Sequence, residues 1–500
     1  MFDISSIAGS RLPARATRAL FPAAIGAVLL AAAPGADNRR NLVRDAFPRL
    51  VDPSVIASGS AIPGEYVIYF GDGIGGPELI GPTVDANAVA DAVRRSDAAE
   101  QMIEGRRDGS ALLSRYRAVL VGFSARLTPA ALVDIQRLPD ARVEPNVAIE
   151  VPDPGYSGPP AAPVSPGATM RTASAPPFPA GLDRIDRRLL PPDTSFQTNS
   201  HGAGVHVYVI DTGVNGDHGE FGGRVGLGYN ATKDGKGTAD CRDHGTAVAS
   251  IIGGNTMGVA SQVIIHPVRV FPCQGLTSST VVFLDGVEWV AKDRVKIRKS
   301  PALANISFKL VLAGSGGALD AAIANSIDKA NIPYVIAAGN DGADACQYSP
   351  AHVPHAITVG NVSPDSDRRK LDSNYGKCID IFAPGVNILA AGVTGPSDWG
   401  TRSGTSFAAP HVSGVAALFL NTNPAANPAV IWAAILLAAD NKDSASPTPL
   451  WCGIPNRMTG SPNVMLHWGS GSANGVYDGP LPPHAPPPPS CSNTARDKAR

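Results

Sequence analysis

Residues 404–420 read GTSFAAPHVSGVAALFL, a Gly-Thr-Ser turn that continues directly into small and apolar residues. A run this apolar predicts a helix buried at the centre of a domain, and its alanines and glycines make that helix thin. Ser406 lies at the mouth of the helix, where the helix dipole and nearby backbone N–H groups favour negative charge. The stretch therefore predicts either a nucleophilic hydroxyl or a simple helix cap.

Apolar strands and helical stretches alternate around this segment, from about residue 179 to residue 468. The strand-like runs are VHVYVI (205–210), VIIHPVRVF (263–271), YVIAAG (334–339) and AITVGNV (356–362). Continuous apolar strands that alternate with helices predict a mostly parallel sheet with helices on both faces, a three-layer α/β domain. In such a domain the functional side chains gather at the carboxyl ends of the strands.

Three further polar residues lie at the ends of predicted elements. Asp211 directly follows the strand at 205–210, His244 opens the helical stretch DHGTAVASIIGG, and Asn340 ends YVIAAGN. Alone, Asp211 can cap a turn and His244 can cap a helix. Together with Ser406, however, they supply an acid that orients a base, a base that activates a hydroxyl, and an amide that stabilises an oxyanion.

Residues 62–151 have a different pattern, in which strand-like and helix-like stretches follow one another. One helix is expected from about Asp85 to Ile103, and a second begins at Thr128-Pro129, a good N-cap followed by a residue suited to the first turn. The order β-α-β-β-α-β predicts a small α+β, ferredoxin-like domain before the larger one.

The remaining segments have no pattern typical of a folded domain. Residues 1–36 contain arginines followed by the apolar run LFPAAIGAVLLAAA, which predicts an export signal, with an ordinary N-terminal helix as the alternative. Residues 152–178 are rich in Pro, Ser and Gly and predict an exposed linker, and residues 469–500 form a Pro-rich tail. We expect a secreted, extracellular protein without a membrane span after signal removal.

Charge and cysteine content narrow the class of protein. The formal net charge is −1, so no basic field indicates a nucleic-acid partner. The six cysteines include no C-x-x-C pair of the metal-binding kind, which favours disulfides in an oxidising compartment. Two cysteines near the C-terminus, Cys452 and Cys491, receive no assignment.

Five short blocks resemble the subtilisin-like serine peptidases, in particular the proteinase K branch. They are IDTG around Asp211, HGT at His244, AAGN ending at Asn340, SNYG with IFAPG near residue 380, and GTSFAAPHVSG around Ser406. Their order along the chain, Asp then His then Ser, is that of the family. The resemblance spans roughly residues 179–468 and implies that Asp211, His244 and Ser406 are the catalytic triad, with Asn340 in the oxyanion hole and no cofactor for catalysis.

The resemblance carries further implications. It pairs Cys241 with Cys273 and Cys346 with Cys378. It suggests a structural Ca²⁺ bound by the Asp380 carboxylate and the carbonyls of Pro354 and Ala356, since that ion prefers oxygen ligands.

The region 62–151 is similar to the family's propeptide, which assists folding and then acts as an intramolecular inhibitor. Self-cleavage is expected near residues 171–178. The product is expected to be a monomer that acts on proteins or peptides.

One segment departs from the family pattern. Where relatives read Ser-Leu-Gly-Gly on the strand that lines the substrate, this chain reads Ser307, Phe308, Lys309 and Leu310. Glycines let a peptide lie against the backbone, so Lys309 and Leu310 are expected to crowd or reshape the substrate pocket.

Two other functions stay open. The altered segment at 307–310 leaves room for a catalytically silent relative that binds peptides. The D-T-G at 211–213 is also a signature of aspartic proteases, but these need two carboxylates, and the chain contains no second D-T-G or D-S-G.

Overall fold

The computed structural model describes residues 59–150, 152, 177–441 and 461–468, apart from gaps at 72, 74, 80–84, 189, 192, 276 and 310–316. The predicted export signal, residues 171–176 of the expected cleavage region, the Pro-rich tail, Leu310, Cys452 and Cys491 lie outside the described residues. No helix in the described ranges is both long and apolar enough to cross a bilayer.

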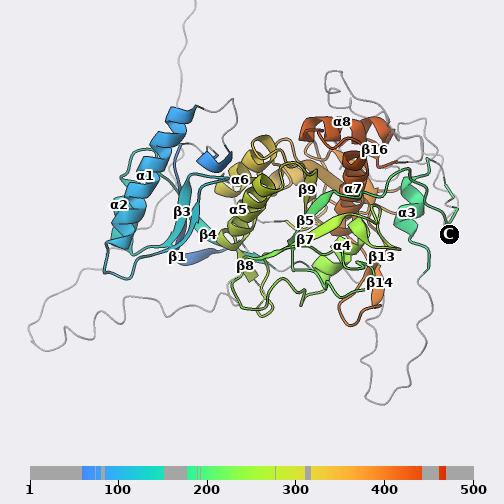
Figure 1. The fold of residues 1–500 in the computed structure, drawn as a ribbon, viewed down its shortest axis with the longest axis horizontal. Helices are drawn as coiled ribbons and strands as arrows, with labels where there is room; N and C mark the ends of the chain where they lie inside the picture. The colour runs from blue at the N-terminus through green and yellow to red at the C-terminus, as the bar shows by residue number, and fades with distance from the viewer. Residues whose placement is uncertain are drawn as a thin grey trace, which may run out of the picture. The chain divides into compact units, whose positions relative to one another are not determined.

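The N-terminal part follows the predicted β-α-β-β-α-β order (Figure 1). Its elements are β1 (Ala61–Tyr69), the 3-10 helix η2 (Pro77–Leu79), α1 (Ala86–Glu104), β2 (Ala111–Tyr116), β3 (Gly122–Arg126), α2 (Pro129–Gln136) and β4 (Arg142–Glu150). The strands form one sheet in the order β2-β3-β1-β4, and β1 pairs antiparallel with both β3 and β4. Thr128 accepts the N–H of Ala131 and caps α2, as its sequence predicts.

The larger part contains a nine-stranded sheet with the order β15-β16-β12-β11-β10-β9-β5-β7-β6. Every neighbouring pair is parallel except β15 and β16, which confirms the predicted parallel sheet. The strands are β5 (His206–Asp211), β6 (Tyr229–Asn230), β7 (Ile264–Arg269), β9 (Ala302–Ile306), β10 (Tyr334–Ala337), β11 (Ile357–Val362), β12 (Ile381–Pro384), β15 (Asp440–Asn441) and β16 (Val464–Met465).

Helices cover both faces of this sheet (Figure 1). They are α3 (Ala180–Ile185), α4 (His244–Gly253), α5 (Thr280–Lys296), α6 (Gly317–Asp328), α7 (Thr405–Thr422) and α8 (Pro428–Ala438), with a 3-10 turn η3 (Ala345–Gln347). Alternate residues of β5 separate the two layers: Val207 and Val209 pack in the core that includes α4, α7 and α8, whereas Tyr208 and Ile210 pack in the core that includes α5 and α6. This arrangement confirms the three-layer α/β prediction.

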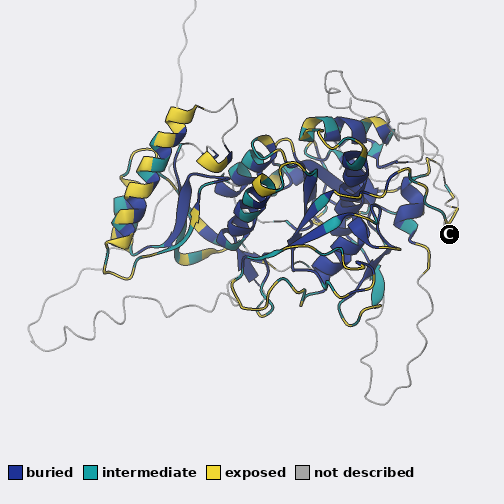
Figure 2. Ribbon diagram, viewed as in Figure 1, coloured by how far each residue is buried: buried dark blue, intermediate teal, exposed yellow. Residues whose placement is uncertain are grey.

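The helix predicted from residues 404–420 is α7, and it is buried from Thr405 to Leu420 (Figure 2). Its alanines and Gly414 permit close packing: a Cβ on Gly414 would lie 2.4 Å from Cβ of Val259. The elements of this part that were not predicted include the short helix α3, the apolar helix α8, and a hairpin formed by β13 (Ile388–Ala391) and β14 (Trp399–Arg402).

The N-terminal sheet continues into the larger part through one more strand. β8 (Thr277–Ser279) pairs antiparallel with β4, with Ala148 opposite Ser279 and Glu150 opposite Thr277. Side chains of the N-terminal sheet, such as Tyr116 and Ile149, lie in the same apolar cluster as residues of α5 and α6.

Candidate active site

The predicted Asp–His pair forms at the carboxyl end of β5. Asp211 is the last residue of β5 and His244 the first residue of α4, and both are fully buried. The imidazole Nδ1 of His244 lies 2.8 Å from Oδ1 of Asp211. A Cβ on Gly245 would lie 3.1 Å from Cβ of Asp211, so a glycine there lets the helix approach the strand closely. Asp211 therefore holds His244 through Nδ1 and leaves Nε2 available to accept a proton.

The other face of the imidazole lies next to the start of α7. The ring of Phe407, the residue after Ser406, has its centroid 5.4 Å from that of His244. Nε2 of His244 has no hydrogen-bond partner among the residues the structure describes. Ser406 retains 8% of its surface, whereas the Asp211 and His244 side chains are sealed off, so of the three only the serine reaches solvent.

Neither of the simple capping interpretations holds. The N-cap of α7 is Gly404, at a φ of 144°, and Ser406 lies inside the first turn. The N-cap of α4 is Asp243 rather than His244. Asp211 does accept the N–H of Thr212, at 2.7 Å, in addition to its bond with His244.

Ser307 supports the backbone of Ser406. Pro410 lies four residues after Ser406 and has no N–H, so the Ser406 carbonyl lacks its usual helical donor. Oγ of Ser307, just after β9, donates to that carbonyl at 2.8 Å, and Ser307 in turn accepts a bond from Nδ2 of Asn305 at 2.9 Å. Ser413, further along α7, donates to Oδ1 of Asn305 at 2.8 Å. All of these side chains are fully buried, so Ser406 lies on a rigid backbone.

Thr405 fixes the orientation of the Asn340 side-chain amide, the predicted oxyanion donor. Its Oδ1 accepts bonds from the backbone N–H and the hydroxyl of Thr405, at 2.9 and 3.0 Å. A Cβ on Gly404 would lie 3.2 Å from the Asn340 amide nitrogen, which places that nitrogen at the start of α7. Because the carbonyl oxygen is held by Thr405, the two N–H groups of the amide are left to donate to a substrate.

Asp240 fixes the segments that carry Asp211 and His244. Its Oδ1 accepts from the hydroxyl of Thr212 at 2.9 Å, and its Oδ2 accepts from the N–H and hydroxyl of Thr246 at 2.8 and 2.6 Å. Thr212 follows Asp211, and Thr246 lies in the first turn of α4. The sequence analysis did not single out Asp240, although its position beside Cys241 and before His244 is visible in the sequence.

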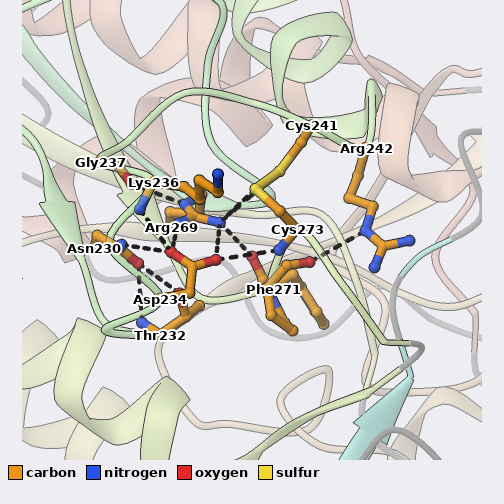
Figure 3. Close-up of polar contacts among 11 residues, drawn as sticks. Asn230, Thr232, Asp234, Lys236, Gly237, Cys241, Arg242, Arg269, Phe271 and Cys273 are labelled. Atoms are coloured by element: carbon orange, nitrogen blue, oxygen red, sulfur yellow. Dashed lines mark hydrogen bonds and ion pairs between the residues drawn. A yellow bond between two sulfur atoms is a disulfide. The ribbon is translucent and has the colours of Figure 1, made fainter.

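A disulfide and an ion pair support the end of β7, the neighbour of β5. The predicted pairings Cys241–Cys273 and Cys346–Cys378 are both present. Arg269 is fully buried and lies between the Asp234 carboxylate and the Cys241–Cys273 bridge (Figure 3). The arginine holds the pKa of the Asp234 carboxyl well below its usual range against the opposing effect of burial. Arg269 is the register partner of Asp211, so this cluster stabilises the strand end beside Asp211 and His244.

The side chains predicted to line the substrate have other roles. Ser307 is fully buried on the Ser406 carbonyl, and Phe308 packs edge-on against Phe271 and Phe283, with centroids 4.8 and 5.1 Å apart. Both side chains face the core, so a contact of these residues with substrate would involve their backbone, and their place on the substrate-lining segment stays a prediction. Lys309 is partly exposed and forms an ion pair with Asp341.

Asp380 is engaged by the protein itself. Its Oδ2 accepts the N–H of Thr358 at 2.8 Å and its Oδ1 accepts the indole N–H of Trp432 at 3.1 Å. Among the described residues, no three His, Cys, Asp or Glu side chains gather in a metal-binding cluster. One carboxylate whose oxygens both accept N–H bonds is a poor match to the six to eight oxygen ligands of Ca²⁺. A Ca²⁺ site with Pro354 and Ala356 stays a prediction, and no step of the mechanism depends on it.

Comparison with protein families agrees with this geometry. Residues 202–454 match the model of the Subtilase family. The chain therefore belongs to the subtilases, which confirms the resemblance drawn from the sequence motifs. The pairing of Asp211 with a histidine also removes the aspartic-protease alternative.

Three curated relatives are similar over much of their length. An extracellular serine proteinase of Thermus sp. (strain Rt41A) is 46% identical over 287 residues, which are 57% of this chain and 65% of the relative. Alkaline serine exoprotease A of Vibrio alginolyticus is 42% identical over 64% of this chain and 55% of the relative. The chain thus spans less than two thirds of these two proteins. Alkaline protease 1 of Aspergillus clavatus is 33% identical over 83% of this chain and 93% of the relative.

A solved structure is similar in the same region. The crystal structure of a cold adapted subtilisin-like serine proteinase superposes with a TM-score of 0.51 and 41% identity, covering 58% of this chain and 97% of that chain.

Proposed function

We propose that this chain is a secreted serine endopeptidase made as a zymogen. The observation that carries the proposal is the buried bond between His244 Nδ1 and Asp211 Oδ1, which leaves Nε2 without a described partner beside the start of α7. A histidine held in this way takes a proton from Ser406 and later returns it to the leaving amine.

The chemistry proceeds in two halves. His244 removes the hydroxyl proton as Oγ of Ser406 attacks a peptide carbonyl, and Asn340 with the N–H of Ser406 stabilises the resulting oxyanion. The C–N bond breaks when His244 protonates the amine, which leaves an acyl group on Ser406. Water, activated by the same imidazole, then releases the acid and regenerates the serine.

The test uses the processed protein and its Ser406→Ala variant on a protein substrate such as casein and on internally quenched peptides. We expect the parent to cut within the peptides and the variant to lose essentially all activity. Equal hydrolysis by the two proteins would overturn the assignment of Ser406.

The zymogen part of the proposal is supported by the contacts of the N-terminal part. Glu288 on α5 accepts three backbone N–H groups from the turn between β2 and β3, those of Arg117, Ala118 and Val119, at 2.8 to 2.9 Å. Together with the β4–β8 pairing, these bonds suit an inhibitor held by its own enzyme. The N-terminal part is proposed to be removed after self-cleavage in the 171–178 region.

Self-cleavage is tested by expressing the full precursor and its Ser406→Ala variant side by side and sequencing the N-termini of the products. We expect the parent to be trimmed within residues 152–178 and the variant to stay full length. If both proteins are trimmed identically, another protease performs the maturation.

Lys309 is proposed to set substrate preference. Its ammonium pairs with Asp341 and lies 5.0 Å from the ring centroid of Tyr348, and its Cδ would lie 3.2 Å from a Cβ on Gly339. The side chain thus runs along the backbone between the ends of β9 and β10, beside Asn340. This placement favours an altered pocket over the loss of catalysis that a silent peptide binder would require.

A further inference from the structure

Asp243, the residue before His244, has an unusual position. It is the N-cap of α4 with a left-handed φ of 73°, and its side chain makes no capping bond to the helix. The N–H groups of the first turn go elsewhere: that of Gly245 to the Thr212 hydroxyl and that of Thr246 to Asp240, both at 2.8 Å. An aspartate at an N-cap usually accepts such bonds itself. Capping therefore does not account for this carboxylate.

The carboxylate of Asp243 instead pairs with a buried arginine. Nη2 of Arg402 donates to Oδ2 of Asp243 at 2.7 Å, and the Arg402 side chain is fully buried. Arg402 is the last residue of β14, and the chain continues from it through Gly404 into α7 and Ser406. The pair thus joins the residue before the catalytic base to the segment that leads to the nucleophile, across 159 positions of sequence.

The backbone at Asp243 needs such an anchor. A non-glycine residue in the left-handed region persists only where its surroundings fix it. The Asp243 N–H donates to Asp240 at 3.0 Å, and the side chain is held by Arg402. Because His244 is the next residue, a change in this turn shifts its imidazole directly.

We propose that the Asp243–Arg402 pair positions His244 against Ser406 and balances the charge beside the imidazole. This role rests on the proposed peptidase function and adds two positioning residues to it. Arg402 and Asp243 touch neither the substrate nor the reacting atoms; they act through His244.

Other charged groups face the same region. Asp211 on β5 is bonded to the imidazole, and Asp240 precedes α4. A Cβ on Gly392, just after β13, would meet the carboxylates of both Asp398 and Asp243, so a further acid lies close to the pair. From α7 the imidazole faces the apolar ring of Phe407, the residue after Ser406. Among the described residues, Arg402 thus places a positive charge in a region that holds several carboxylates.

The charge balance makes opposite predictions for the two partners. Asp243→Asn keeps a residue that tolerates the left-handed backbone but removes one negative charge from the surroundings of the imidazole, which disfavours a protonated imidazole. Arg402→Met removes one positive charge from the same surroundings, which favours the protonated imidazole. The acid limb of the kcat/KM profile is therefore expected to move by about one pH unit, downward in Asp243→Asn and upward in Arg402→Met.

The experiment measures kcat and KM from pH 5 to 9 on a peptide substrate for the parent, the two single variants and the double variant. We expect each single variant to lose about tenfold in kcat with little change in KM, because the base is displaced rather than the substrate site. The double variant is expected to bring the acid limb back near that of the parent. Arg402→Lys keeps the positive charge and is expected to keep the acid limb of the parent. It is measured in place of Arg402→Met if that variant does not fold.

Arg184→Met is the matched control, since Arg184 forms an equally buried ion pair with Asp367 in another part of the larger domain. It is expected to lower thermal stability without moving the acid limb. An acid limb that stays the same in all folded variants would overturn the positioning role, even with an active parent. An inactive parent would instead overturn the proposed peptidase function.

Discussion

In the proposed mechanism, the Asn340 side chain is oriented in advance for a charge that exists only during the reaction. Both bonds from Thr405 go to its carbonyl oxygen, so the amide nitrogen is presented at the start of α7 before any substrate arrives. Preorganised donors of this kind cost no reorganisation at the moment of reaction.

Asn340→Ala should therefore lower kcat by about 10² to 10³, the loss observed when subtilisin is deprived of its own amide donor. KM should change little, because the bond forms mainly in the transition state. Steady-state kinetics on a peptide substrate tests this. A fall confined to KM would show that Asn340 binds the ground state instead.

His411 gives a pH-dependent contribution to stability. It is buried in α7, its Nδ1 donates to the Phe407 carbonyl at 2.9 Å, and burial lowers its pKa from 6.5 to about 4. The folded protein thus favours the neutral form. The stabilisation is complete above pH 6.5 and is lost as the pH falls towards 4, because the unfolded chain binds the proton more readily.

We expect the free energy of unfolding to fall less steeply between pH 6.5 and pH 4 in His411→Gln than in the parent. Urea denaturation of both proteins, inactivated first with a fluorophosphonate to prevent self-digestion, measures the difference. The exposed His201→Gln is the control and should keep the parent slope. An identical slope in all three proteins would contradict the account.

At the scale of elements, the sequence predicted the strands and helices that carry the site. Long apolar runs such as 205–210 and 404–420 are stable in one environment, the interior of a layered domain. Their pattern is therefore sufficient to predict a buried strand or helix. The β13–β14 hairpin and α3 were missed because they are short and their residues follow no clear period.

The support of Ser406 was also missed, because it depends on contacts between distant segments. Pro410 was the available signal: it marks an unpaired helical carbonyl at Ser406, but its partner, Ser307, becomes evident only once β9 and α7 are adjacent. The triad could be recognised from motifs, whereas Ser307 was assigned to the substrate and Asp243 and Arg402 received no role.

Ser307→Ala is expected to leave the Ser406 carbonyl buried without a donor. Stability should fall by about 1 to 3 kcal/mol, and kcat should fall as well because the nucleophile loses its rigid support. Ser326→Ala is a matched control, since Ser326 is a fully buried serine bonded to Tyr334 at 3.0 Å on α6. Thermal melts and kcat on both variants check this. Equal kcat losses in the two would mean that general destabilisation is responsible.

At the scale of the whole molecule, the N-terminal part and the larger part are joined by backbone bonds to acidic side chains. Glu288 receives the N–H groups of residues 117–119, and Glu144 of β4 accepts the N–H of Ala318 at the start of α6 at 3.0 Å. A carboxylate that accepts several N–H groups forms strong, charge-assisted bonds.

Glu288→Gln should weaken this attachment. We expect the lag between cleavage of the precursor and the appearance of full activity to shorten, because the cleaved inhibitor leaves sooner. Asp91→Asn, on the exposed surface of α1, is the control and should keep the parent lag. Time courses of processing on gels and of peptide hydrolysis provide both readings. An unchanged lag in Glu288→Gln would contradict the role of this contact.

The central claim is that Asp211, His244 and Ser406 act as one unit, and labelling with a fluorophosphonate tests it most directly. After removal of the N-terminal part, mass spectrometry of the digested protein should place the adduct on Ser406 alone. The label should be absent in Ser406→Ala, and Asp211→Asn should slow labelling by about 10⁴-fold. An adduct on another residue, or an unchanged rate in Asp211→Asn, would contradict the account.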